Sequence, residues 1–330
     1  MSITVGFQGS EGSFTNKAAT NFFGSLPNSS NIEFSSAPTC RAIFELVSSG
    51  KLSYGVLPVE SSNHGTMPMY LESLLKHSQS VRIVGETIER EHHCLCVQPG
   101  TTEATISRII SHPIILEDCN VFIDALSARH GVDIEQSTAN DSAAACKLLS
   151  TGGPNNNTAV ICTRDAAALY GMSVLSQNVG NDRNSETRYI IIAYAAGDAL
   201  EIAKLSQNTN EKVKGSLTLS IKNSAGSMFK MMSCFSLRDI NILKIESRPS
   251  SAAIGLNDSV GSVFRHWDMV FFIDYEVSED TAKNAALWAN LEEYCDWARP
   301  LGEYKQFGQQ QATITEMANW STMLDILSTA

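Results

Sequence analysis

Over its first 195 residues the chain alternates short apolar runs with longer segments of helical spacing. This order is typical of βαβ units, in which helices cover a mainly parallel sheet. The apolar runs predict strands at residues 3–7, 54–58, 82–91, 93–97, 159–162 and 188–193. Helical spacing between them predicts helices at residues 16–23, 41–48, 69–76, 119–129, 142–149 and 165–170. We therefore expect two α/β lobes, with functional groups in the loops at the carboxyl ends of the strands.

A polar stretch without periodicity, residues 206–214, predicts a linker to a second unit. Beyond it, the pattern predicts strands at 216–222, 242–248 and 270–276, helices at 227–237 and 281–296, and a short strand near Tyr304. This order fits a ferredoxin-like βαββαβ domain. Two further segments have weaker patterns: residues 249–268 predict an extended loop, and residues 313–327 predict a docked or oligomer-contacting helix.

Charge and composition exclude several classes of function. With 43% hydrophobic and 18% charged residues, the chain is predicted to be folded almost throughout. A net charge of -11 argues against binding to nucleic acid or to an acidic membrane, so an anionic substrate must be held by a few local donors. There is no apolar run of about 18 residues that would predict a membrane span. The eight scattered cysteines and the absence of a signal-like N-terminus predict a reduced, cytoplasmic protein.

A Gly-rich turn at residues 6–15 is the first candidate site. Its glycines are spaced G-x-x-G-x-x-G, whereas a dinucleotide fingerprint needs G-x-G-x-x-G, although Glu33 lies at the distance which that fingerprint requires. The altered spacing disfavours a nucleotide, because it misplaces the backbone that must approach the pyrophosphate. Two alternatives remain: an ordinary tight turn, or a helix N-terminus, capped by Ser13 or Thr15, that holds a carboxylate.

Two further segments place polar groups at strand ends. Residues 55–66 leave an apolar strand and enter a loop that contains hydroxyls, an amide and the carboxylate of Glu60. Residues 178–189 lead into another apolar run and place Thr187 and Arg188 at its mouth. An Arg in that position can bind a carboxylate through two hydrogen bonds.

Several short motifs match a known family in number, order and spacing. In the first unit they are Gly9–Thr15, Pro58–Ser62 with Gly65, Ser111–Ile114 with Cys119, and Thr187–Tyr189. In the second unit they are Gly226, Glu246–Pro249 and Leu301–Tyr304. They correspond to the motifs Gly-Pro-x-Gly-Thr-Phe-Ser, Pro-Ile-Glu-Asn-Ser, Ser-His-Pro-Gln, Thr-Arg-Phe, Pro-Gly-Ala-Leu, Glu-Ser-Arg-Pro and Leu-Gly-Ser-Tyr. Over about residues 3–305 the chain resembles the prephenate dehydratase family with a C-terminal ACT regulatory domain.

The resemblance implies an α/β fold: a two-lobed, periplasmic-binding-protein-like catalytic region followed by a ferredoxin-like βαββαβ ACT domain. The expected catalytic domain is residues 1–205, with lobe one at about 1–78 and 179–205 and lobe two at about 79–178. The expected ACT domain is residues 214–308, and residues 309–330 form a tail.

The implied reaction is the decarboxylating dehydration of prephenate to phenylpyruvate in phenylalanine biosynthesis, which needs no metal or organic cofactor. By resemblance, Thr187 assists the departing hydroxyl, and Arg188 and Glu60 complete the expected catalytic set. A Thr is a weak acid in water, so its contribution must come from an aimed hydrogen bond in a dry cleft. The expected substrate contacts are Ser13, Phe14, Ser61, Ser62, Ser111, Ser142 and Tyr189.

The resemblance also implies feedback regulation by phenylalanine, bound where ACT domains of two subunits meet, and hence a homodimer or homotetramer. The expected effector contacts come from the loop before a helix and from one strand: Asn223, Ala225, Gly226, Ser227, Met228, Glu246, Ser247 and Arg248.

The chain departs from the family motifs at Ser61 and Ile114, each of which replaces an amide side chain, and at Ser185, which replaces an Asn. These departures leave alternatives open: an arogenate dehydratase, or an amino-acid-binding regulator whose catalytic cleft has decayed. A metal site on the strand that carries His92, Cys94 and Cys96 is not expected, because that face offers no fourth ligand.

Overall fold

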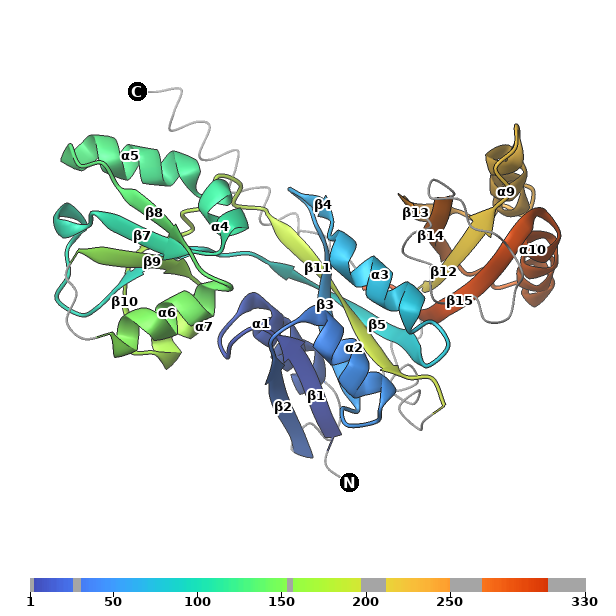
Figure 1. Ribbon diagram of the computed structural model, residues 1–330, viewed down its shortest axis with the longest axis horizontal. Coiled ribbons are helices and arrows are strands. Elements are labelled where there is room, and N and C mark those ends of the chain that lie inside the picture. The colour runs from blue at the N-terminus through green and yellow to red at the C-terminus, as the bar shows by residue number, and fades with distance from the viewer. Residues whose placement is uncertain (1–2, 26–30, 153–156, 197–211, 250–268, 308–330) are drawn as a thin grey trace, which may run out of the picture.

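The computed structural model describes residues 3–25, 31–152, 157–196, 212–249 and 269–307. Each of its three parts is built on a sheet of its own, and the parts follow one another along the long axis of the molecule, with the first lobe in the middle (Figure 1). The predicted extended loop at 249–268 lies outside the described residues except for Pro249, and the predicted helix at 313–327 lies wholly outside them. Among the helices of the described residues, none is both long and apolar enough to cross a membrane.

Lobe one contains a sheet in the order β2-β1-β3-β11-β5, with the short β4 paired to β3. Strand β1 is parallel to both of its neighbours, β2 and β3, whereas β11 runs antiparallel to both β3 and β5, and β4 runs antiparallel to β3. The elements are β1 Ile3–Gln8, α1 Phe14–Gly24, β2 Ile32–Ala37, α2 Cys40–Ser48, β3 Tyr54–Ser61, β4 Gly65–Thr66, α3 Pro68–Lys76, β5 Val81–Arg90 and β11 Glu186–Tyr194.

Lobe two contains a second sheet in the order β10-β6-β9-β7-β8. Its elements are β6 Cys94–Val97, η2 Glu103–Thr105, β7 Arg108–Ser111, α4 Pro113–Asp118, α5 Asn120–His130, β8 Glu135–Thr138, α6 Ser142–Thr151, β9 Thr158–Cys162, α7 Arg164–Leu169 and β10 Ser173–Gln177. The expected boundary at residue 79 is wrong. Strand β5 pairs along its whole length with β11, so it belongs to lobe one, and the chain crosses between the lobes at residues 91–93 and again at 178–185.

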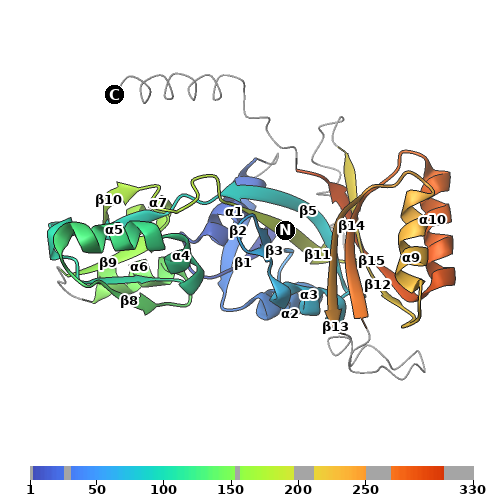
Figure 2. The same ribbon diagram turned by 90° about the horizontal axis from the view of Figure 1, so that it is seen from above.

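The third part has the predicted βαββαβ order and a sheet in the order β13-β14-β12-β15. Its elements are β12 Val213–Ile221, α9 Ser227–Ser236, β13 Ile242–Pro249, β14 Met269–Glu276, α10 Thr281–Tyr294 and β15 Cys295–Lys305. The last strand is much longer than the short strand predicted near Tyr304. Helices α9 and α10 cover the face of the sheet that points away from lobe one (Figure 2).

The other face of the third sheet packs directly on lobe one. Val270, Phe272, Leu301 and Tyr304 join a core cluster with residues of α2, α3, β3, β5 and β11. At Gly302 the backbones approach so closely that a Cβ would lie 2.1 Å from the carbonyl oxygen of Ile83. Only glycine fits this contact, which gives a structural reason for the glycine of the Leu-Gly-Glu-Tyr segment.

Strand β11 lies at the centre of this arrangement, and its two faces pack in different hydrophobic cores. Tyr189 and Ile191 pack in the core under α1, whereas Ile190 and Ile192 pack in the core shared with α2, α3 and the third sheet. Successive side chains of a strand point to opposite faces. Neighbouring residues at the start of β11 therefore serve different surfaces of the molecule.

Candidate active site

Thr187 lies near the start of β11, where the chain returns from lobe two to lobe one. Its side chain is 1% exposed, and its Oγ1 donates a hydrogen bond of 2.8 Å to Oε1 of Glu91. Ser185 Oγ lies 3.4 Å from the other oxygen of the same carboxylate. The hydroxyl predicted to react is thus aimed at a carboxylate in the segment where the chain crosses between the lobes.

Glu91 belongs to a group of acidic and histidine side chains, which we call the junction cluster: Glu91, His93, Asp118 and His64. The Nε2 atom of His93 lies 3.8 Å from Oε2 of Glu91, and the Nε2 atom of His64 hydrogen-bonds to Oδ1 of Asp118 at 2.9 Å. Burial raises the pKa of Glu91, an effect that the hydrogen bond from Thr187 opposes and the nearby Asp118 increases. Burial lowers the pKa of His93 to about 4, so its imidazole is neutral at pH 7.

The two lobes touch through the Gly-rich turn between β1 and α1. The backbone N–H and hydroxyl of Ser10 donate to Oδ2 of Asp141, at 3.2 and 3.0 Å, and Thr163 Oγ1 donates to the carbonyl of Gly12 at 2.6 Å. A Cβ on Gly12 would lie 2.8 Å from Cα of Ala166, and its φ of +84° is unfavourable for other residues. The turn is therefore a surface where the lobes meet, which accounts for Gly12 without a nucleotide.

A cavity of about 310 Å³ lies between the lobes. Phe14 and Lys17 of α1 line one side, and the rest of the lining comes from lobe two, including Arg164, and from the two crossing segments, with His92 and Asn178. The ring of Phe14 also packs edge-on against His93, with 5.3 Å between ring centroids, so Phe14 connects the cavity with the junction cluster. Thr187 is not among the residues that line this cavity.

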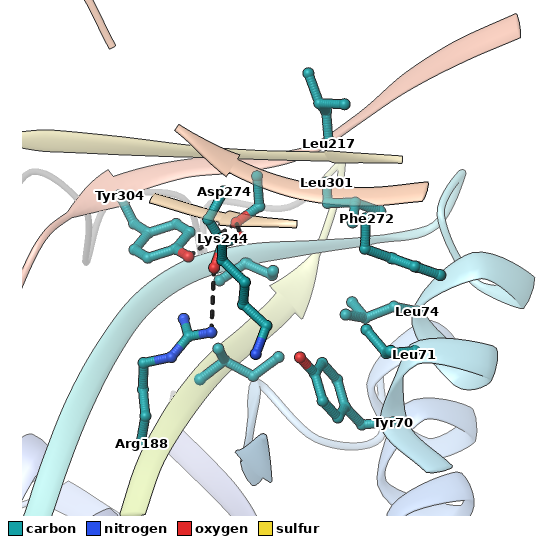
Figure 3. Close-up of a pocket in the computed structure, with 13 residues that line it drawn as sticks. Tyr70, Leu71, Leu74, Arg188, Leu217, Lys244, Phe272, Asp274, Leu301 and Tyr304 are labelled. Atoms are coloured by element: carbon teal, nitrogen blue, oxygen red, sulfur yellow. Dashed lines mark hydrogen bonds and ion pairs between the residues drawn. The ribbon is translucent and has the colours of Figure 1, made fainter. Parts of the chain in front are cut away.

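The structure does not bring Arg188 and Glu60 together with Thr187. Arg188 points to the opposite face of β11, where it contacts Glu60 and Glu86 of lobe one at 3.0 and 3.2 Å. There it also contacts Asp274 of the third sheet at 3.1 Å (Figure 3). Burial disfavours its charge, but the surrounding groups, Asp274 foremost, keep the pKa of Arg188 above its ordinary value. Glu60 in turn lies 2.6 Å from Lys244. We call Arg188, Glu60, Glu86, Asp274 and Lys244 the joint network. This network connects lobe one with the third sheet, and it does not face the junction cluster.

Most of the expected substrate contacts have local structural partners. Ser13 caps α1 by accepting from the N–H of Asn16, Ser61 accepts from the N–H of Asn63, and Ser62 accepts from the N–H of Glu186. Ser111 donates to the carbonyl of Ile161. Tyr189 is buried in the core under α1, and Ser142 is the buried first residue of α6. Of the seven, Phe14 alone lines the interlobe cavity.

The expected effector residues lie on two separate elements of the third part. Asn223, Ala225 and Gly226 precede α9, and Gly226 has the left-handed φ of +80° at the helix N-cap. The hydroxyl of Ser227 lies 2.8 Å from that of Ser224, and Met228 is exposed on the first turn.

Glu246, Ser247 and Arg248 lie on β13, the edge strand of the third sheet. Arg248 reaches toward lobe one, with 3.8 Å to Glu72 of α3.

The site contains three residues that were not predicted from the sequence: Glu91, Asp118 and His64. They come from the end of β5, the end of α4 and the turn after β3, and no spacing along the chain relates them. The one available signal was the run Glu91-His92-His93, since two histidines and a carboxylate at the end of an apolar strand are unusual enough to examine.

Comparison with known proteins identifies the family. The profile described as Prephenate dehydratase matches residues 5–196. The chain belongs to the prephenate dehydratase family. It is 30% identical over 308 residues to Arogenate dehydratase/prephenate dehydratase 1, chloroplastic, of Arabidopsis thaliana, covering 92% of this chain and 72% of the relative. It is 28% identical over 332 residues to Arogenate dehydratase 3, chloroplastic, of the same plant, covering 97% and 69%.

Solved structures show the same fold. The prephenate dehydratase of Arthrobacter aurescens in complex with L-Phe aligns with a TM-score of 0.74 at 21% identity, over 99% of this chain and 100% of the other. A protein described as a novel type of quorum quenching acylase, GqqA, aligns with a TM-score of 0.73 at 21% identity, over 93% and 100%. At these identities the likeness extends to the fold alone.

Proposed function

We propose that this family member is a prephenate dehydratase that converts prephenate to phenylpyruvate, with Thr187 as the hydroxyl that assists the departing group. The observation that carries this proposal is the buried Thr187, at the junction of two lobes, within a sequence that matches the family over 5–196. Arogenate is the second candidate substrate, because several similar relatives are named as arogenate dehydratases.

The reaction requires mainly that the protein position the substrate and one hydrogen-bond donor. The bond between the ring and its carboxylate breaks, carbon dioxide leaves, and the electron pair enters the ring. The ring C–O bond breaks at the same time, and the oxygen leaves with its electron pair and takes up a proton to become water. In our proposal the hydroxyl of Thr187 exchanges its hydrogen bond to Glu91 for one to that oxygen when the substrate is bound, and one aimed donor of this kind is worth about 10²–10³ in kcat.

Anionic groups of the substrate need cationic partners, and the interlobe cavity offers Lys17 and Arg164. In our proposal these two side chains take the role that was expected of Arg188, which is engaged in the joint network. The cavity lies within the range of about 300–1,000 Å³ that is typical of small-molecule sites.

The test is turnover of purified full-length protein with prephenate and with arogenate, following phenylpyruvate and phenylalanine. Thr187→Val keeps the volume and removes the hydroxyl, so kcat should fall by about 10²–10³ while Thr187→Ser retains most of it. Thr218→Val is the matched control, because Thr218 is equally buried but lies in the third sheet. Full activity in Thr187→Val, or no turnover of either substrate by the wild type, would refute the proposal.

We further propose that the third part is an ACT domain that senses phenylalanine and inhibits the enzyme. Its βαββαβ order, the Glu246–Pro249 motif and the left-handed Gly226 before α9 support this assignment. A solved structure with the same fold is described as a complex with L-Phe. Calorimetry with L-Phe, and light scattering with and without it, should reveal saturable binding to a dimer or tetramer. Phenylalanine that neither binds nor lowers kcat would exclude this role.

A further inference from the structure

The junction cluster brings three possible metal ligands together at the place where the lobes meet. One oxygen or nitrogen from each of Glu91, His93 and Asp118 lies within 4.8 Å of the other two. Two of the three residues, Glu91 and His93, lie in the segment where the chain crosses between the lobes, after β5 and before β6, and Asp118 ends α4 of lobe two. The site is therefore assembled by the tertiary fold instead of by one strand, unlike the His92, Cys94 and Cys96 set.

Two members of this group have buried polar side-chain atoms without a hydrogen-bond partner among the described residues. Within the part of the chain that the structure describes, neither ring nitrogen of His93 has a hydrogen-bond partner, although the side chain is 1% exposed. The Oδ2 atom of Asp118 is also buried and unpaired among the described residues. Buried polar atoms without partners are uncommon in native proteins and indicate an unaccounted ion, water or catalytic role.

The remaining atoms of the cluster resemble the outer shell of a metal site. His64 engages Oδ1 of Asp118, which leaves Oδ2 available as a ligand. Thr187 and Ser185 hydrogen-bond to the carboxylate of Glu91 and hold its orientation. Such contacts to ligating carboxylates are the common means of orienting a metal centre.

We propose that Glu91, His93 and Asp118 bind one divalent transition-metal ion of the zinc type beside Thr187. The two carboxylates balance the charge of the ion, which also relieves the repulsion between two neighbouring, largely buried anions. One imidazole and two carboxylates suit zinc, cobalt or manganese better than magnesium, which prefers oxygen ligands alone. Three protein ligands leave a coordination position open for water or for an oxygen of a substrate.

This binding site does not depend on the proposed dehydratase activity. In a dehydration, the open coordination position of a bound ion would accept the departing oxygen; in a hydrolytic reaction, it would hold the attacking water. Metal binding is therefore measured without reference to turnover, and its result stands whichever substrate the enzyme uses.

The experiment uses purified full-length protein stripped with a chelator and titrated with Co²⁺, followed by its visible absorption and by calorimetry. We expect one Co²⁺ per chain, displaced by Zn²⁺ and unaffected by excess Mg²⁺. Glu91→Gln, Asp118→Asn and His93→Gln should each weaken binding by at least about 100-fold, since loss of an outer-shell partner alone costs about 10–100-fold.

Matched controls lie next to the ligands in the sequence. Glu117→Gln and His92→Gln change an exposed carboxylate and an exposed imidazole, and should leave Co²⁺ affinity unchanged. Circular dichroism checks the fold of each variant, and the near-isosteric Asp118→Asn decides the matter if His93→Gln does not fold. The proposal is overturned if the wild type binds no Co²⁺, if Mg²⁺ competes with it, or if the ligand variants bind as the wild type does.

Discussion

The joint network predicts a strong energetic coupling between Arg188 of lobe one and Asp274 of the third sheet. Their side chains are 11% and 15% exposed, and Nη2 of Arg188 lies 3.1 Å from Oδ2 of Asp274. At that distance and an effective dielectric constant of about 20, the Coulomb attraction is about 5 kcal/mol before desolvation. Removing one partner of a buried ion pair costs about 3–5 kcal/mol, and we expect that loss of unfolding free energy for Arg188→Gln.

A double-mutant cycle isolates the pair. Glu86 keeps Lys214 at 2.8 Å and Glu60 keeps Lys244 at 2.6 Å, so the carboxylates other than Asp274 remain paired when Arg188 is changed. Unfolding in urea of the wild type, Arg188→Gln, Asp274→Asn and the double variant should give a coupling energy of about 1–3 kcal/mol.

The control cycle uses Arg41 and Glu45, an ion pair on α2 with side chains 70% and 51% exposed. Exposed pairs at this spacing contribute about 0.3–0.5 kcal/mol. If the coupling of Arg188 with Asp274 is no larger than that of the control pair, the joint network does not hold the domains together, and the reasoning from its burial is wrong.

Two other predictions test the contact between the lobes at the Gly-rich turn and the charge of Glu60 in the joint network. The variant Gly12→Ala should lose more unfolding free energy than Gly131→Ala and should also lower kcat. Both glycines have a positive φ, which costs about 1–2 kcal/mol for alanine. Only at Gly12 does the new Cβ also meet the other lobe, at 2.8 Å from Cα of Ala166. Equal losses in the two variants, measured by denaturation, would argue against that contact. The second prediction concerns pH. Burial opposes the charge of Glu60, but Lys244 and Arg188 bring its pKa below the ordinary 4.5. The charged Glu60 therefore stabilises the folded state fully above pH 4.5, and this contribution is lost as the pH falls through the lower, folded-state pKa. The wild type should therefore lose more stability than Glu60→Gln between about pH 6 and about pH 3 in thermal melts, and parallel curves would contradict the prediction.

Periodicity predicted the elements that carry a strong apolar pattern, and it failed for short polar strands. β8 has the sequence Glu-Gln-Ser-Thr and three of its four residues are exposed, so nothing in its composition distinguishes it from a loop. It forms because β7 offers a parallel edge, which is a tertiary effect. The boundary of lobe one was misplaced for a related reason: the pairing of β5 with β11 joins residues about a hundred positions apart.

Prediction of the site was limited by the same distances along the chain. The motif at residues 187–189 predicted that Thr187 lies at the mouth of a strand, and the structure has it near the start of β11, but the motif also implied that its neighbour Arg188 would face the substrate. In a strand, however, adjacent side chains point to opposite faces, so a pair at a strand mouth cannot both face one cleft. This rule was available from the sequence alone, whereas the partners Glu91 and Asp118 became visible only once the lobes were placed side by side.

The alternation along β11 has a consequence for regulation. Thr187 hydrogen-bonds at the lobe junction, and the next residue, Arg188, is bound to Asp274 of the domain proposed to sense phenylalanine. β11 is paired on both sides, with β3 and β5, so Arg188 cannot follow a shift of the third sheet without moving the strand that holds Thr187. An effector changes an equilibrium only through contacts that differ between two states. The contact between Arg188 and Asp274 is one that a shifted third sheet would break, and Asp274→Asn should therefore weaken any response of kcat to phenylalanine more than it changes phenylalanine binding.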